Sequence, residues 1–238
     1  GGAFAEYLEA SERCVVAQDP RGVAAHAVAD DLRRVGDPRT RESRQAGHER
    51  DGVRDGGMGQ FVVQLAKLAG NHVIAICSSE EKLEYLRSLG VNRAINYSKE
   101  NIGAVLKTEY PNGLDLVFES VGGNIFKTVL ENVAVHGRIL LFSAVSDYQG
   151  AKVENPLLSP DVNHTIQRKS VSLRGFFMPN FAKFVLEYIG KLLALAHDGK
   201  LKVGIDPTEF KGLEGTTDAI DRLFGKNNIG KLVVKLVN

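Results

Sequence analysis

From residue 57 onward, hydrophobic and polar positions follow two alternating periods. A helical face of apolar residues begins just after the glycines at 56–59. His72–Cys77 is a nearly continuous apolar run, as expected of a parallel strand buried on both faces. Further strands are predicted at 94–97, 114–119, 137–142 and 171–176, and further helices at 79–89, 102–110 and 124–134. This alternation predicts an α/β fold with a doubly wound parallel sheet.

The last third of the chain is less regular. Residues 143–170 keep neither period, and we interpret them as a loop and an irregular connection. Helices are predicted at 181–198 and 214–225, and a strong final strand at 231–237.

The first 55 residues break the pattern. Residues 1–20 read as the end of a β-rich unit, with Cys14–Val16 as a short strand candidate. Residues 21–55 contain eight arginines, no lysine and a single leucine, and neither period persists in them. They are either a basic disordered linker or sequence translated out of frame, which gives such a composition when the gene is GC-rich.

Composition narrows the function classes. The 238 residues are 43% hydrophobic and carry a formal charge of +1, which gives no reason to expect nucleic acid or an anionic membrane as partner. No apolar run approaches the roughly 20 residues of a membrane span. Two cysteines are too few for a disulfide framework or a thiolate zinc site, so a reducing compartment fits. We expect a cytoplasmic location, with mitochondria and peroxisomes as alternatives because the true N-terminus is missing.

A glycine cluster is the first candidate for chemistry. Gly56, Gly57 and Gly59 run directly into the predicted helix. Glycine lets a ligand approach the backbone, and a helix N-terminus attracts phosphate. The same pattern also fits a tight turn, so the other strand ends must decide between the two.

Hydroxyl and ammonium groups follow the strand at 72–77. In an open parallel sheet the ligand lies beyond the carboxyl ends of the strands, and NAD-preferring sheets carry an acid at this one. Here Ser78, Ser79 and Lys82 stand in its place, a combination that suits the 2′-phosphate of NADP(H). Alternatively, Ser79 is an ordinary helix N-cap and Lys82 a plain surface residue.

Small residues follow two other strands. Ser120 opens a Ser-Val-Gly-Gly segment after the strand at 114–119, and Ser143 follows Phe142 after the strand at 137–142. Such segments let a flat ring approach the backbone and leave backbone groups available to an amide.

These segments together resemble the medium-chain dehydrogenase/reductase superfamily, and within it the quinone oxidoreductase-like branch. The resemblance rests on 56–67, 77–82, 94–97, 115–123 and 229–234. It implies a remnant of a GroES-like catalytic β domain at 1–20, an NADP-binding Rossmann domain at 56–200, and a return to the catalytic domain with a final strand at 201–238. The anomalous Arg-rich segment at 21–55 lies between the first two.

The resemblance also implies individual roles. The groups that would cradle the pyrophosphate are Gly56, Gly57, Met58 and Gly59, with Asn228 nearby. The groups that would hold the 2′-phosphate are Ser78, Lys82 and Tyr97, with Ser79 as a further cofactor contact. The groups that would line the nicotinamide riboside are Ser120, Phe142, Ser143 and Tyr148, of which Tyr148 is the catalytic candidate. Phe176, Phe177 and Met178 would close over the nicotinamide and the substrate.

The resemblance implies a zinc-independent, NADPH-dependent reductase of quinones or of activated double bonds, such as 15-oxo-prostaglandin-like enones. It also implies a homodimer. A non-catalytic NADPH-binding or structural protein on the same fold, or an inactive fragment, is the alternative. One departure stands out. Residues 49–55 occupy the place of the first strand of the dinucleotide fold but lack its character, which makes that strand doubtful. If 21–55 is the true chain, we expect the sheet to lose its first central strand.

Overall fold

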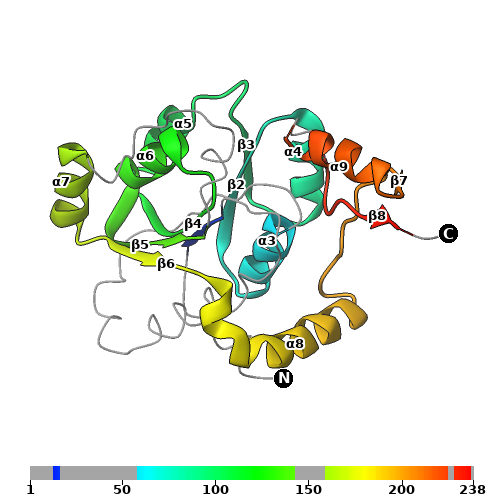
Figure 1. The fold of residues 1–238 in the computed structure, drawn as a ribbon. Helices are drawn as coiled ribbons and strands as arrows, with labels where there is room; N and C mark the ends of the chain where they lie inside the picture. The colour runs from blue at the N-terminus through cyan, green and yellow to red at the C-terminus, as the bar shows by residue number, and fades with distance from the viewer. Residues whose placement is uncertain (1–12, 17–57, 143–158, 225–227, 237–238) are drawn as a thin grey trace.

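The computed structural model describes residues 13–16, 58–142, 159–224 and 228–236 (Figure 1). Six strands form one sheet in the order β3-β2-β1-β4-β5-β6, and every pairing in it is parallel. The strands are β1 (Arg13–Val16), β2 (His72–Cys77), β3 (Arg93–Asn96), β4 (Leu114–Glu119), β5 (Val133–Leu141) and β6 (Ser172–Gly175). The predicted doubly wound parallel sheet is confirmed.

Helices connect the strands and pack on both faces of the sheet (Figure 1). They are α3 (Gly59–Leu68), α4 (Glu80–Ser88), α5 (Ile102–Glu109), α6 (Gly123–Glu131), α7 (Pro160–Lys169), the 3₁₀ helix η4 (Met178–Phe184), α8 (Val185–His197) and α9 (Glu214–Phe224). A two-stranded parallel sheet of β7 (Phe210–Lys211) and β8 (Val234–Lys235) lies apart from the main sheet.

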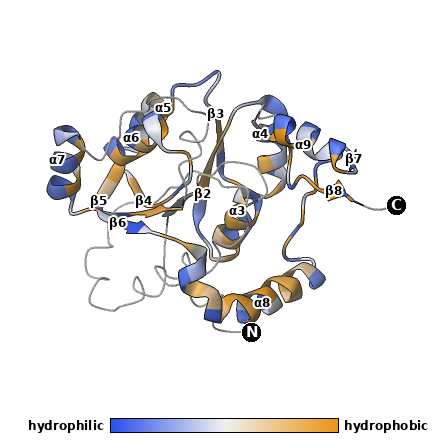
Figure 2. Cartoon of the chain, viewed as in Figure 1, coloured by the Kyte–Doolittle hydropathy of each residue, from blue (hydrophilic) through white to orange (hydrophobic). Residues whose placement is uncertain are grey.

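The side-chain period of the strands explains the two cores. In β2, Val73, Ala75 and Cys77 belong to the cluster that contains residues of α3 and α4. Ile74 and Ile76 point the other way, into the cluster that contains residues of α5 and α6. Successive side chains of a strand face opposite sides, so a strand covered on both faces must be apolar at nearly every position. The hydrophobic colouring of β4 and β5 shows the same consequence (Figure 2).

The position of β1 corrects one expectation. Arg13–Val16 lies at the centre of the sheet, with Cys14 opposite Val73 of β2 and Val15 opposite Val117 of β4. We expected these residues in a GroES-like remnant and, if 21–55 is the true chain, the first central strand to be lost. A gap between β2 and β4 would leave two rows of buried backbone groups without partners, and this short segment fills it. Residues 17–57 lie outside the described residues, so both interpretations of 21–55 stay open.

Two predictions for the last third of the chain were wrong. Pro160–Lys169 is helix α7 rather than part of an irregular connection. It buries only Val162, so its apolar stripe was too thin to reveal it, although proline at its first turn was an available signal. The final strand is only Val234–Lys235, because it pairs with the equally short β7. The other domain boundaries stay predictions.

Candidate functional site

The strand order defines where a ligand can bind. After β1 the chain adds β2 and β3 on one side and then β4, β5 and β6 on the other, which makes the carboxyl ends of β1 and β4 the topological switch point. Five of the six strands are followed immediately by a residue that is predicted to contact the cofactor. These residues are Ser78, Tyr97, Ser120, Phe142 and Phe176. The parallel topology therefore places the starts of all five segments along one edge of the sheet.

Helix α3 begins at this edge. Met58 occupies its N-cap position without a side-chain capping bond, and both Met58 and Gly59 are buried. The first turn of α3 contains no acidic residue, so the turn itself adds no negative charge at the positive end of the helix. The predicted pyrophosphate contacts Gly56 and Gly57 lie outside the described residues.

The ends of β2 and β3 meet side by side. Cys77 is in register with Asn96, and the Tyr97 amide donates to the Cys77 carbonyl oxygen at 3.0 Å. The Ser98 hydroxyl donates to the Ser78 carbonyl oxygen at 2.8 Å. These bonds hold the segments carrying Ser78 and Tyr97 together, as a shared phosphate contact requires.

Ser79 agrees with its alternative interpretation as a helix N-cap, whereas Lys82 does not agree with its alternative as a surface residue. The Ser79 hydroxyl oxygen accepts a bond from the Lys82 amide at 3.4 Å, so Ser79 is indeed the N-cap of α4. Its hydroxyl still has a proton to donate. Lys82 is only 5% exposed, so it is not a plain surface lysine. A nearly buried ammonium beside the strand end is suited to a phosphate.

One acid near this strand end, Glu80, was not among the predicted site residues. Glu80 accepts a hydrogen bond from the Asn96 side-chain amide at 2.7 Å and forms an ion pair with Lys99 at 3.2 Å. The Asn96 bond first, and Lys99 second, lower the pKa of Glu80. Its carboxylate is therefore ionised and already engaged within the protein.

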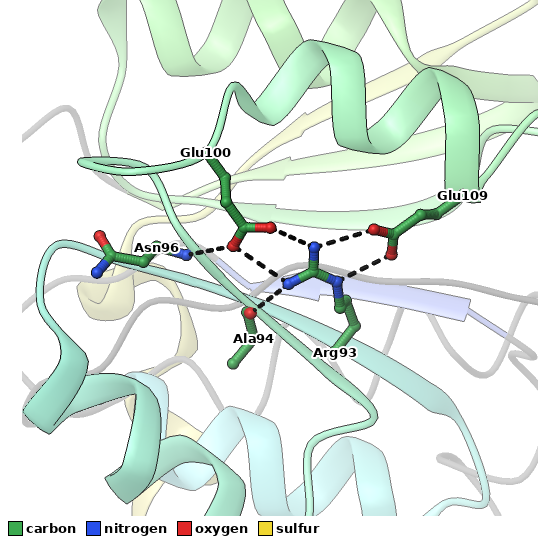
Figure 3. A network of polar contacts seen from close by, with 5 residues as sticks. All are labelled: Arg93, Ala94, Asn96, Glu100 and Glu109. Atoms are coloured by element: carbon green, nitrogen blue, oxygen red, sulfur yellow. Dashed lines mark hydrogen bonds and ion pairs between the residues drawn. The ribbon is translucent and has the colours of Figure 1, made fainter.

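Arg93 fixes the loop that carries Tyr97 (Figure 3). Its guanidinium group bonds Glu109 through two nitrogens at 2.9 Å each and also bonds Glu100, which in turn accepts from the Asn96 amide at 3.2 Å. Glu109 first, and Glu100 second, raise the pKa of Arg93, and its guanidinium lowers the pKa of both carboxyls. One side chain at the start of β3 thus ties together both ends of the loop and helix that follow.

The turn after β4 presents a buried hydroxyl. Glu119 accepts hydrogen bonds from the amides of Val121 at 2.8 Å and Gly122 at 2.9 Å, so its carboxylate shapes the turn. Ser120 is fully buried, and its Oγ has no hydrogen-bond partner in the structure. A buried hydroxyl without a partner costs free energy, which a polar ligand group could recover. The observation therefore fits a cofactor at the predicted place.

Four phenylalanines form a row of stacked rings beside the turn. Ring centroids are 5.2 Å apart between Phe118 and Phe142, 5.2 Å between Phe142 and Phe176, and 4.8 Å between Phe176 and Phe181. Phe176 is thus a core residue, whereas Phe177 is 66% exposed. Adjacent residues of an extended chain face opposite ways, so the two cannot share a contact surface.

Several functional candidates fall elsewhere or outside the described residues. Asn228 is buried, and its Nδ2 donates to the Gly230 carbonyl oxygen at 3.2 Å. Ser143 and Tyr148 lie outside the described residues. Met178 opens η4, and its side chain is likewise outside them.

Sequence reasoning missed a hydrogen-bonded set of residues next to Asn228 and α3. It consists of the buried Gln60, Gln64 and Asp206 and the half-buried Gly204 and Arg222. The one available signal was a pair of glutamines four residues apart on a largely apolar helix. Their partners lie far away in sequence, so no local pattern could identify them.

Residues 13–16, 58–142, 159–224 and 228–236 contain neither a cluster of metal ligands nor a membrane-spanning helix. No three His, Cys, Asp or Glu side chains gather there in a way that could hold a metal ion. No helix among these residues is long and apolar enough to cross a membrane.

Comparison with known proteins gives consistent matches. Residues 57–195 match the zinc-binding dehydrogenase family. A protein of Leishmania amazonensis named "Probable quinone oxidoreductase" is 36% identical over 99% of this chain and 71% of its own length. Mouse prostaglandin reductase-3 is 40% identical over 76% of this chain, which spans half of that protein. The crystal structure of CurA from Vibrio vulnificus with NADPH has a TM-score of 0.71 and 27% identity, over 79% of this chain and 56% of CurA.

Proposed function

The chain belongs to the zinc-binding dehydrogenase family of the medium-chain dehydrogenase/reductase superfamily, and on that basis we propose that it binds NADPH and serves hydride transfer in a reductase. The observation that carries the nucleotide choice is the group set at the ends of β2 and β3. Two serine hydroxyls and a nearly buried lysine accompany a tyrosine held on the neighbouring strand end. Hydroxyl donors and a cation match a phosphate dianion.

The state of Glu80 supports the same choice. In an NAD-binding sheet an acid at this strand end accepts hydrogen bonds from the ribose hydroxyls. Glu80 is instead occupied by Asn96 and Lys99. The ion pair also reduces the repulsion that a bare carboxylate would exert on a 2′-phosphate.

The protein's part in the reaction is binding and orientation. The bound nucleotide would supply the hydride. The α3 N-terminus would hold the pyrophosphate, and Ser78, Ser79, Lys82 and Tyr97 would hold the 2′-phosphate. Ser120 Oγ would bond a polar group of the nicotinamide riboside, and Phe142 would bound that site from the neighbouring strand. Fixing the cofactor in this way converts hydride transfer into a step between oriented groups.

The substrate class we propose is a quinone or an enone. The relatives named above include a quinone oxidoreductase and a prostaglandin reductase, and a tobacco 2-alkenal reductase is 32% identical over 75% of this chain. The chain spans 71% of the Leishmania protein and half of mouse prostaglandin reductase-3. Tyr148 stays the proposed catalytic residue. A metal-free mechanism also stays a proposal.

A binding experiment with two nucleotides tests the core of this proposal. NADPH and NADH dissociation constants would be measured by nucleotide fluorescence for the unsubstituted chain and for Lys82→Ala. We expect NADPH to bind more tightly, and Lys82→Ala to weaken NADPH by about tenfold or more while changing NADH little. Lys107→Ala, which removes a lysine from the exterior of α5, is the matched control. Equal losses for both nucleotides would contradict the 2′-phosphate assignment.

A non-catalytic NADPH-binding role on the same fold is the second candidate. NADPH oxidation with a panel of quinones and enones separates the two. Turnover of any acceptor supports the reductase. Tight NADPH binding with no turnover would support the binding role, and no melting-temperature shift with NADPH would indicate an inactive fragment.

A homodimer is the proposed assembly. Strand β6 is the last strand of the sheet and pairs only with β5 among the described strands, so its outer edge offers backbone groups to a second copy. Light scattering after size-exclusion chromatography would show the mass of a dimer, and a monomer mass at micromolar concentration would exclude it.

A further inference from the structure

Two glutamine side chains on α3 pair with an extended segment that lies far away in sequence. Gln60 donates to the Gly204 carbonyl oxygen at 3.0 Å and accepts from the Gly204 amide at 2.6 Å. Gln64 donates to the Lys202 carbonyl oxygen at 2.9 Å and accepts from the Lys202 amide at 2.6 Å. Each side-chain amide thus replaces a neighbouring strand. In Figure 1 the segment leading from α8 toward β7 passes beside α3.

The repeat distances of helix and strand make this pairing possible. Four residues of an α-helix rise about 6 Å along its axis. Two residues of an extended chain cover about 6.6 Å, and their backbone groups point to the same side. Glutamines at positions i and i+4 therefore match the backbone groups of residues j and j+2. Gln64 also donates to the Gln60 carbonyl oxygen at 2.9 Å, which keeps both amides on one face of the helix.

The pairing between Gln60 and Gly204 is tightly enclosed by neighbouring side chains. The Tyr85 hydroxyl donates to Gln60 Oε1 at 2.8 Å, which connects α4 to the same pair. A Cβ on Gly204 would collide with the Tyr85 hydroxyl and approach Gln60 Oε1, so a larger residue would have to displace both side chains. Both glutamines are buried, so their amides cannot turn to water when a partner moves.

The Gly204 carbonyl oxygen that accepts from Gln60 also connects to the region of Asn228. The Lys231 amide donates to this oxygen, and the Asp206 amide donates to the Lys231 carbonyl oxygen, each at 2.9 Å. The Asp206 carboxylate accepts from the Ile229 amide at 2.8 Å. Residues 202–206 therefore link α3 to residues 228–231.

We propose that Gln60 and Gln64 are positioning residues, which set the Asn228 segment against the N-terminus of α3 so that both can hold the same nucleotide. The inference rests on the proposed function and on the contact of Asn228 with the pyrophosphate, which the sequence resemblance predicts. The glutamines themselves need not touch the nucleotide. They act through two steps of backbone hydrogen bonding.

The test combines single and double substitutions in the full chain. Gln60→Met keeps the side-chain length and removes both bonds to Gly204, so we expect about fivefold weaker NADPH binding. Asn228→Ala should weaken binding to a similar degree. If Gln60 acts through Asn228, the double variant should bind NADPH no more weakly than Asn228→Ala alone. Loss of fold stability by itself would instead give effects that add.

Asn71→Ala is the matched control. Asn71 is a buried amide at the other end of α3 and donates to the Ala66 carbonyl oxygen at 3.0 Å. Asn71→Ala should lower the melting temperature, as Gln60→Met does, but should leave the NADPH dissociation constant unchanged. Gln60→Glu, which keeps the acceptor and loses the donor, should fall between the unsubstituted chain and Gln60→Met.

Amide hydrogen exchange without nucleotide gives an independent reading. Gln60→Met should speed exchange at Gly204, Ile229 and Lys231, whereas Asn71→Ala should not. Unchanged exchange and unchanged NADPH affinity in Gln60→Met, or additive effects in the double variant, would overturn the inference. If the unsubstituted chain binds no NADPH, the proposed function fails and this inference fails with it. Binding that Gln60→Met does not alter overturns the inference alone.

Discussion

Replacing Asp206 should cost more stability than almost any other single change near the site. Its side chain is completely buried and accepts hydrogen bonds from two amides, Ile229 at 2.8 Å and Thr208 at 2.9 Å, and from Arg222 Nε at 3.1 Å. Two bonds to neutral donors at about 1 kcal/mol and one charge-assisted bond at about 2 kcal/mol give about 4 kcal/mol for Asp206→Ala. Asp206→Asn keeps an acceptor oxygen but loses the charge, so it should cost about 2 kcal/mol.

The pH dependence follows from the direction of the pKa shift. Burial acts to raise the pKa of Asp206, but the hydrogen bonds from Ile229, Thr208 and Arg222 outweigh it, and the native pKa is lowered. The unfolded value is about 3.9. The charged carboxylate therefore contributes its full stabilisation above about pH 5, and this contribution is lost as the pH falls through the native pKa. The amide of Asp206→Asn does not titrate, so its deficit should shrink on acidification.

Urea unfolding at pH 7 and near pH 3 measures both quantities. Asp218→Asn is the matched control, because Asp218 is an exposed aspartate on α9, the helix that carries Arg222. It should change the free energy of unfolding by less than about 0.5 kcal/mol. A deficit of Asp206→Asn that is equal at both pH values, or a deficit at pH 7 no larger than that of the control, would refute the reasoning.

Three further predictions concern stability and use the same unfolding assay. Phe176→Ala removes the middle of the stacked row and should cost about 3–5 kcal/mol, whereas the exposed Phe177→Ala should cost under about 1 kcal/mol; similar losses would contradict the burial of the row. Arg93→Met should cost about 1–2 kcal/mol at pH 7, after discounting for solvent, and less as its two carboxylate partners protonate below about pH 4; a cost independent of pH would argue against the network. Gly230→Ala should destabilise by more than about 2 kcal/mol, because φ is +75° and a Cβ would lie 2.5 Å from a backbone oxygen, while Gly190→Ala on the open face of α8 should stabilise by about 0.5–1 kcal/mol; the same sign for both would be inconsistent with this geometry.

Local patterns were sufficient for the elements that obey them. The apolar run of β2 predicted a strand with both faces covered, and Ser79 marked the start of α4. These signals work because burial and capping depend on residues a few positions apart. Helix α7 escaped the same reasoning, since it touches the core mainly through Val162 and its periodic signal is weak.

The candidate site was predicted only in part, for the same reason. Residues that follow strands could be chosen in advance, because all carboxyl ends of a parallel sheet share one edge. The engagement of Glu80 could not, since its partners Asn96 and Lys99 reach it from the next strand. The stacking of Phe176 on Phe142 was equally invisible, because it depends on β5 and β6 being neighbours.

The sequence by itself determined most of the segments that become buried strands, the helix that follows the glycines, and the side chains that stand at the strand ends. It could do so because each of these depends on the order of residues along a few turns or a single strand. Only the tertiary structure decided that Arg13–Val16 occupies the centre of the sheet and that Gln60 holds Gly204, 144 positions away. Buried backbone and side-chain groups must find hydrogen-bond partners wherever the folded chain supplies them, and that choice is not written in any local pattern.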